Sequence, residues 1–222
     1  MALTDTVEEQ HVLERLLDEF KPEVPPAARK LHWLLFTPFR YPPPPGGSRF
    51  RGPNDPGVFY GADEIRTACA ELGYSRWRHL CDTPALSMMP TKPQTVFRAQ
   101  IAASSVDLRR PPFDADSATW TRPDSYSDCQ RFAAVAREAD LGVIRYESVR
   151  DPARGGCGAV LVPTAFARAT PFDQQTWMLA VARERVIWRR TGVIRQQEFE
   201  FDAARWQSPV ARAPAARMRR RR

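Results

Sequence analysis

Apolar residues recur at helical spacing in the N-terminal part of the chain. They predict a helix over 4–20, with Thr4 or Asp5 as its cap and a proline after its end. The apolar stripe of this helix consists of Val12, Leu13, Leu16, Leu17 and Phe20. A second helix is predicted over 25–37, because prolines open the segment and Pro38 follows it.

The hydrophobic pattern predicts two more helices, over 63–74 and 125–142. Asp63 is the candidate N-cap of the first, and one face of that helix carries Ile65, Ala68, Cys69 and Leu72. Strand patterns occur at 57–62, 95–108, 142–150, 157–163, 176–182 and 185–202. Helices come first and strands dominate later, which predicts an α+β fold rather than alternating βαβ units.

Length and composition suit one domain with extensions. The chain has 222 residues, of which 43% are hydrophobic. The sequence contains no apolar run that approaches the roughly 18 residues needed to cross a bilayer. Its N-terminus is acidic where a secretory signal would be basic and then apolar. We therefore expect a soluble, cytoplasmic chain with no membrane partner.

The formal charge of +7 is concentrated at the C-terminus. The basic tail 209–222 carries six arginines, and the rest of the chain has a net charge of about +1. A nearly neutral body argues against direct recognition of nucleic acid, and the tail is predicted to be disordered. The four cysteines form no CxxC pair, and no histidine lies at metal-ligand spacing to them. We therefore expect free, buried thiols and no metal site.

Candidate chemistry begins in a Pro- and Gly-rich loop over 40–57. Arg49 and Arg51 in this loop are suited to a pyrophosphate, because guanidinium groups pair with phosphate oxygens through two hydrogen bonds. Tyr60 ends the next strand, and Glu71 lies on the following helix. Taken singly, each of these residues is equally typical of an ordinary surface or core position.

A second candidate lies in the segment IRYESVRDPARGG. Its strand ends at Ser148, with Arg145, Glu147 and Arg150 alternating around it. Polar residues at a strand end before a glycine loop suit the edge of a site, and they equally suit an ordinary strand-to-loop transition. The chain contains no GxGxxG after a strand, no Walker sequence, no HExxH and no GxSxG.

Three segments over about residues 30–165 together resemble the RES-domain toxins. They are LLFTPFRYPPPPGGSRFRGPNDPGVFYGADEIRTACAEL, VDLRRPPF with the later SYSDCQ, and IRYESVRDPARGGCGAVLVP. The resemblance places the family's arginine on Arg49, with Arg51 as the second candidate. It places the family's glutamate on Glu71, its strand tyrosine on Tyr60 and its serine on Ser148.

The PFRY segment adds Arg40 and Tyr41, which resemble a further Arg-Tyr pair lining the family's pocket. Many members carry Arg-Trp-Asn-Pro-Pro-Gly where this chain has the longer Arg-Phe-Arg-Gly-Pro-Asn-Asp-Pro-Gly. The insertion leaves the choice between Arg49 and Arg51 open. The resemblance assigns Glu71, Arg49 and Ser148 to catalysis, and the arginines, tyrosines and serine to substrate binding.

The resemblance implies a fold like that of mono-ADP-ribosyltransferases and NAD as the substrate, without a metal. Some RES toxins degrade NAD by hydrolysis or phosphorolysis, and others transfer ADP-ribose to a protein, including a phosphoribosyl pyrophosphate synthetase. Each is blocked by an Xre-type antitoxin, which provides the only link to DNA. Transfer is favoured here because the long N-terminal helices and the form of the PFRY loop resemble the protein-modifying branch.

The expected organisation has three parts. A helical extension over 1–37 packs on the core, the RES domain spans 38–208, and the basic tail occupies 209–222. Three other functions are weighed against ADP-ribosyl transfer: an NAD-degrading glycohydrolase or phosphorylase, a non-catalytic domain that only binds a partner, and a nucleic-acid-binding protein. A cleavage of the nicotinamide–ribose bond passes through a cationic, oxocarbenium-like state, which a carboxylate such as Glu71 stabilises.

Overall fold

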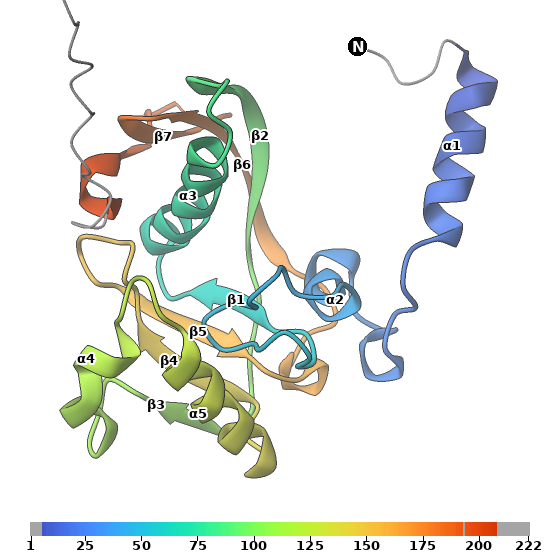
Figure 1. The fold of residues 1–222 in the computed structure, drawn as a ribbon. Coiled ribbons are helices and arrows are strands. Elements are labelled where there is room, and N and C mark those ends of the chain that lie inside the picture. Colours follow the sequence, from blue (N-terminus) through green and yellow to red (C-terminus); the bar gives the residue numbers. More distant parts are fainter. Residues whose placement is uncertain (1–5, 193, 208–222) are drawn as a thin grey trace, which may run out of the picture.

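Two four-stranded sheets form the body of the protein (Figure 1). The computed structural model describes residues 6–192 and 194–207. The first sheet has the order β1 (Phe59–Ala62), β5 (Gly156–Val160), β4 (Val143–Glu147) and β3 (Ser105–Asp107). The second has the order β2 (Met88–Arg98), β6 (Phe172–Ala182), β7 (Arg185–Arg190) and β8 (Glu198–Asp202). Apart from the parallel pair β3–β4, all neighbours are antiparallel, and the predicted α+β class is confirmed.

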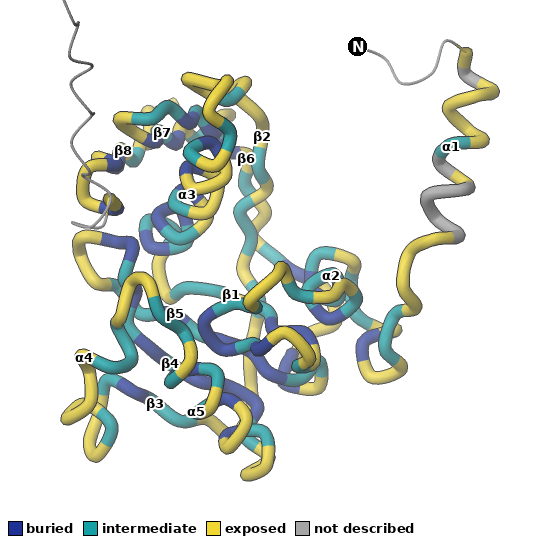
Figure 2. Tube along the Cα trace, viewed as in Figure 1, coloured by how far each residue is buried: buried dark blue, intermediate teal, exposed yellow. Residues whose placement is uncertain are grey.

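Helices cover both faces of the first sheet. Residues alternate between the faces of β4, so that Ile144 packs toward helix α5 (Ser127–Glu138) and Val143 toward helix α2 (Trp33–Arg40). The α2 side is closed by aromatic rings, including Phe39 packed edge-on against Phe166 at 6.2 Å between centroids. The two central strands, β4 and β5, are therefore predominantly buried, as Figure 2 shows.

Helix α3 (Ile65–Cys81) lies on the second sheet and has one buried face (Figures 1 and 2). This face carries Ala70, Trp77 and Leu80, which pack among the tryptophans of β6 and β7, and the ring nitrogen of Trp77 donates to the Arg183 carbonyl at 2.9 Å. The predicted helix over 63–74 is thus too short, because burial of its last two turns extends it to Cys81.

Two predictions about helix boundaries are wrong. Asp63 is not the cap of α3: Glu64 occupies the cap position and makes no side-chain cap bond, while Asp63 pairs with Arg145. The second predicted helix does not end before Pro38 but includes it in α2. A proline removes one helical hydrogen bond, and here it lies between the buried residues Leu35 and Phe39, whose packing outweighs that loss.

The segment predicted as one strand over 95–108 belongs to both sheets. Strand β2 ends at Arg98, the chain crosses over at 99–104, and β3 begins at Ser105 in the other sheet. Local alternation cannot reveal such a crossing, because both pieces have strand character.

The remaining helical segments are short: η1 (Pro26–Ala28), η2 (Phe113–Asp116), α4 (Ser117–Trp120), η3 (Pro163–Ala165) and η4 (Ala203–Trp206).

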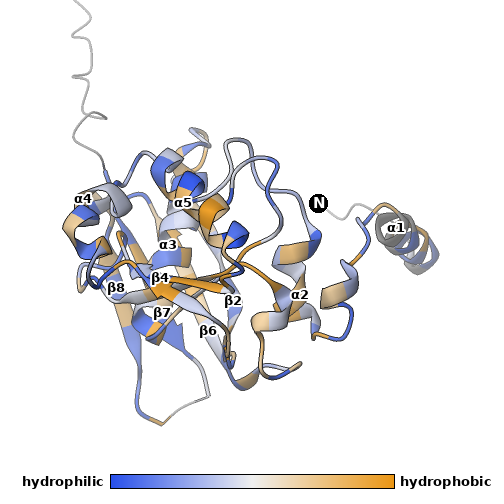
Figure 3. Cartoon of the chain, turned by 90° about the horizontal axis from the view of Figure 1, so that it is seen from below, coloured by the Kyte–Doolittle hydropathy of each residue, from blue (hydrophilic) through white to orange (hydrophobic). Residues whose placement is uncertain are grey.

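The N-terminal helix α1 (Val7–Glu19) stands away from both sheets in Figures 1 and 3. Its start is a capping box, in which Thr6 accepts from the Glu9 amide and Glu9 accepts from the Thr6 amide. The expected caps, Thr4 and Asp5, lie outside the described residues, as does the tail 209–222. The domain boundaries at 37/38 and 208/209 stay predictions.

Within the described residues, the helices lack the combination of length and apolar character that a membrane span requires.

The four cysteines are free thiols. Burial raises the pKa of both Cys69 and Cys157 to about 12, so that these thiols are protonated at neutral pH. Cys129 is also buried and its pKa is raised by burial, while Cys81 is half-buried. The prediction of buried free thiols is confirmed for three of them, and the protonated state argues against a thiolate nucleophile.

Candidate functional site

A groove of about 2400 Å³ runs along α3, between β1 on one side and β2 on the other. Of the residues predicted from the sequence, Arg49, Tyr60 and Glu71 line it. Acidic and basic side chains are balanced in its walls. The basic residues are Arg49, Arg66, Arg78, Arg98, Arg145 and Arg150, and the acidic ones are Asp63, Glu64, Glu71, Asp82, Asp124 and Glu198.

Glu71 and Ser148 form the closest pair of the predicted site. Ser148 Oγ donates to Glu71 Oε1 at 2.6 Å, although the two residues are 77 positions apart in the sequence. The serine is fully buried, and its oxygen also accepts from the backbone amides of Arg150 and Asp151 at 3.2 and 2.9 Å. These bonds fix the serine hydroxyl, and the serine in turn fixes one oxygen of the carboxylate at the groove wall.

Arg49 is buried to 9% exposure and holds a neighbouring loop. Its Nη1 donates to the carbonyls of Trp120 and Arg122 at 2.9 and 3.0 Å. Its guanidinium lies 4.8 Å from the ring centroid of Tyr126, in a cation–π contact. Arg49 therefore ties the 120–126 segment to the groove wall and places a positive charge there.

Tyr60 anchors the loop that carries Arg49. Its hydroxyl bonds to Ser48 Oγ at 2.8 Å and accepts from the Phe50 amide at 2.9 Å, and burial raises its pKa. Gly47 in the same loop has φ of +77°, and a Cβ there would lie 2.1 Å from the Arg51 carbonyl oxygen. Only glycine tolerates both the positive φ and this close approach. The tight turn at Gly47 therefore fixes the backbone that leads to Arg49.

The structure places the other three predicted residues away from this groove. Arg51 donates to the carbonyls of Asp55 and Tyr41, and burial lowers its pKa. Arg40 donates to the Pro22 carbonyl and lies 5.8 Å from the ring of Tyr41. None of Arg40, Tyr41 and Arg51 is among the described residues that line the groove. Their contacts brace the Pro-rich loop.

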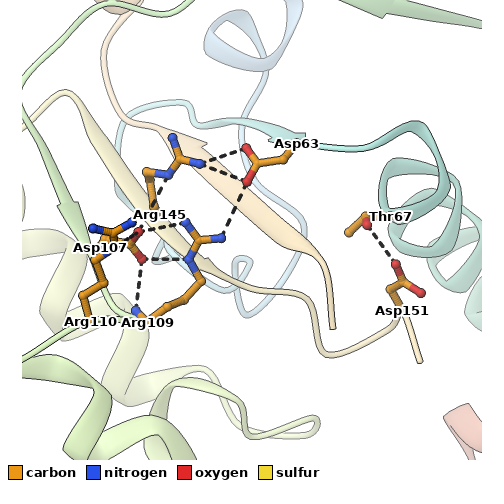
Figure 4. A network of polar contacts seen from close by, with 7 residues as sticks. All are labelled: Asp63, Thr67, Asp107, Arg109, Arg110, Arg145 and Asp151. Carbon is orange, nitrogen blue, oxygen red and sulfur yellow. Dashed lines mark hydrogen bonds and ion pairs between the residues drawn. The ribbon is translucent and has the colours of Figure 1, made fainter. Parts of the chain in front are cut away.

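Asp151, Thr67 and Tyr74, which the sequence did not single out, lie around the Glu71–Ser148 pair together with Arg150 from the second candidate segment. Asp151 is buried to 3% exposure and accepts from Thr67 Oγ1 at 2.8 Å (Figure 4). Arg150 lies 3.6 Å from the ring centroid of Tyr74 and donates to the hydroxyl of Tyr126 at 3.2 Å. A four-residue spacing from Thr67 to Glu71 is the sequence signal that places both on one face of the helix.

An ion-pair network lies around Asp63, just before the first turn of α3 (Figure 4). Arg145 on β4 contacts both carboxylate oxygens of Asp63 at 3.0 and 2.9 Å. Arg109 binds both oxygens of Asp107 at 2.8 Å and reaches Asp63 at 3.6 Å. Hydrogen bonding to Arg109 lowers the pKa of Asp107, so this carboxylate is ionised at neutral pH. The described residues hold no group of three or more His, Cys, Asp or Glu arranged for a metal ion.

The fold and site together define an α+β protein with a serine-held glutamate and a buried arginine in a large groove. Residues 24–182 match the RES domain family, and the chain belongs to this family. No curated protein matches the chain. Family membership indicates an NAD-utilising enzyme with a function of the toxin–antitoxin type. The match begins inside the predicted N-terminal extension and ends at the last residue of β6.

Proposed function

We propose that the protein is a toxin that consumes NAD and transfers ADP-ribose to a cellular protein. The observation that carries this proposal is the Glu71 carboxylate, held by Ser148 at 2.6 Å in a groove that Arg49 and Tyr60 also line. A phosphoribosyl pyrophosphate synthetase is the candidate acceptor, because the resemblance to protein-modifying RES toxins suggests it. NAD is a substrate in this reaction rather than a resident cofactor.

The proposed reaction breaks the bond between ribose C1′ and the nicotinamide nitrogen. The bonding electrons leave with nicotinamide, the ribose becomes oxocarbenium-like, and an acceptor atom attacks C1′ as it loses its proton. Glu71 stabilises the positive ribose and hydrogen-bonds its hydroxyls, while Ser148 holds the carboxylate. Arg49 attracts the pyrophosphate, and the ring of Tyr60 offers a face to nicotinamide.

The size of the groove favours transfer over degradation. Pockets for small molecules usually have volumes of about 300–1000 Å³, whereas this groove has about 2400 Å³. The additional space suits a segment of an acceptor protein beside NAD. Hydrolysis or phosphorolysis of NAD is the second candidate, since the same carboxylate serves either nucleophile. The intact set of Arg49, Tyr60, Glu71 and Ser148 argues against a domain that only binds a partner.

NAD labelled on its adenylate group distinguishes these functions. We expect that incubation of the chain with this NAD and a cell lysate puts label on a discrete protein band. The Glu71→Gln variant is the control for non-enzymatic labelling. Label that appears only in small molecules supports degradation instead. Intact NAD after incubation with active, folded protein contradicts both reactions and leaves only binding.

Arg49→Ala is expected to weaken NAD binding roughly tenfold or more, because a charge-assisted hydrogen bond contributes about 1.5–3 kcal/mol. Arg51→Ala is expected to have a smaller effect, since Arg51 braces the backbone at Tyr41 and Asp55 away from the groove. NAD titration by calorimetry measures both. Because Arg49 also holds the 120–126 segment, melting temperatures are compared in parallel, and Arg49→Lys tests the charge alone. Equal, small effects from both alanine variants would exclude Arg49 as the pyrophosphate clamp.

A further inference from the structure

Three polar residues at the start of α3 are spaced by four positions: Asp63 precedes the helix, and Thr67 and Glu71 lie on one of its faces. Each makes a side-chain contact with β4 or the loop that follows it. Arg145 binds Asp63, Asp151 binds Thr67, and Ser148 binds Glu71. We call these three contacts the polar seam; Figure 4 shows the first two. The residue Asp63 before the helix and the first two turns of α3 are thus held against one continuous stretch of chain, 145–151.

The middle contact of the seam is the most buried. Asp151 has 3% exposure and Thr67 has 2%. One oxygen of Asp151 accepts from Thr67 Oγ1 at 2.8 Å, and the other accepts from the Ala153 amide at 3.0 Å and faces Arg66 Nε at 3.4 Å. A buried carboxylate with this many donors remains in one position, because any displacement leaves a buried polar group without its partner.

The loop 148–155 is closed on itself and rests directly on Thr67. The Ser148 amide donates to the Gly155 carbonyl at 2.8 Å, and the Arg154 amide donates to the Asp151 carbonyl at 2.8 Å. A Cβ on Gly155 would lie 2.1 Å from Thr67 Oγ1, so the backbone approaches the threonine as closely as glycine permits. The position of Thr67 therefore sets the position of the loop that carries Ser148.

We propose that Thr67 and Asp151 are positioning residues that set the reactive orientation of the Glu71 carboxylate. The inference rests on the proposed function, in which Glu71 acts on the ribose. Thr67 and Asp151 are fully buried and act through the loop: their bond sets Ser148, and Ser148 sets Glu71 Oε1. Catalytic groups need placement within about 0.5 Å, so loss of the middle contact lowers the rate of the chemical step while NAD still binds.

Thr67→Val tests this proposal, because it removes the hydroxyl and keeps the branched shape. We expect kcat for NAD consumption to fall about tenfold to a hundredfold while KM stays within about twofold. Thr67→Ser, which keeps the hydroxyl, should retain most of the wild-type kcat. Thr83→Val is the matched control, since Thr83 follows the same helix and its hydroxyl donates only to the His79 carbonyl. Asp151→Asn is the second variant, used if Thr67→Val does not fold.

Amide hydrogen exchange at Arg150 and Asp151 gives a readout that does not depend on NAD. Both amides donate to Ser148 Oγ, so Thr67→Val should accelerate their exchange and Thr83→Val should not. Faster exchange with unchanged kcat would show a merely structural contact and overturn the proposal. Unchanged exchange would overturn it as well. If the wild-type protein does not consume NAD, the proposed function fails, and this inference about Glu71 fails with it. A low kcat in Thr67→Val but not in Thr83→Val, together with faster amide exchange, supports the inference.

Discussion

Glu71→Gln is expected to reduce NAD turnover by about a hundredfold to a thousandfold, because one preorganised electrostatic contact of this kind contributes on the order of 3 kcal/mol to the barrier. The amide keeps the shape of the side chain and can still accept from Ser148 Oγ, but it lacks the negative charge that stabilises an oxocarbenium-like ribose. The fold should survive, since Glu71 is only partly buried and lies at the groove wall. Turnover at saturating NAD is the measurement.

The matched control is Glu64→Gln, which removes a carboxylate from the position just before α3 in the same groove. Glu64 is exposed and makes no side-chain cap bond, so this variant should turn over NAD at nearly the wild-type rate. Melting curves for both variants separate lost chemistry from lost structure. Near-full activity of Glu71→Gln would show that another group stabilises the cation. A comparable loss in both variants would show that the groove responds to its total charge.

Hydrophobic periodicity predicted the class of fold and most of the elements. The stripe of helix α5 and the alternation of β4 are local patterns, and each is imposed by burial on both sides of the first sheet. The ends of elements depend on distant packing, as in α3, where Trp77 and Leu80 extend the helix against the second sheet. For the same reason the crossing between β2 and β3 could not be read from the segment 95–108.

The candidate site was only partly accessible from the sequence. The contact between Glu71 and Ser148 joins positions 77 apart, and only the resemblance to a family placed them in one site. For Asp63 the local pattern was misleading, because a short acidic residue before a helix suits both an N-cap and a long-range ion pair. Arg49 and Arg51 are separated by only one residue, and their different partners depend on segments that are distant in sequence: Arg49 binds carbonyls of the 120–126 segment, whereas Arg51 binds those of Tyr41 and Asp55.

We further propose that an Xre-type antitoxin controls the enzyme by occupying the groove. An NAD-consuming enzyme harms its own cell unless it is blocked, and a helical, DNA-binding partner that inserts its C-terminal part would prevent entry of NAD. The groove walls carry as many acidic as basic residues, so the partner need not be acidic overall. It should place a carboxylate at the end where Arg49 lies and so imitate the pyrophosphate. Contact with DNA would then belong to the partner, in line with the nearly neutral body of this chain.

Competition between the partner and NAD is therefore expected to be nearly complete. Calorimetric titration of NAD into the free chain should show binding, whereas the purified complex should show affinity lower by about a hundredfold or more, as expected when one tight ligand excludes another. A partner truncated at its C-terminus is the control, because it should lose the block while any other contact with the chain remains. NAD that binds the complex as tightly as the free chain would show that the antitoxin does not act by occupancy of the groove.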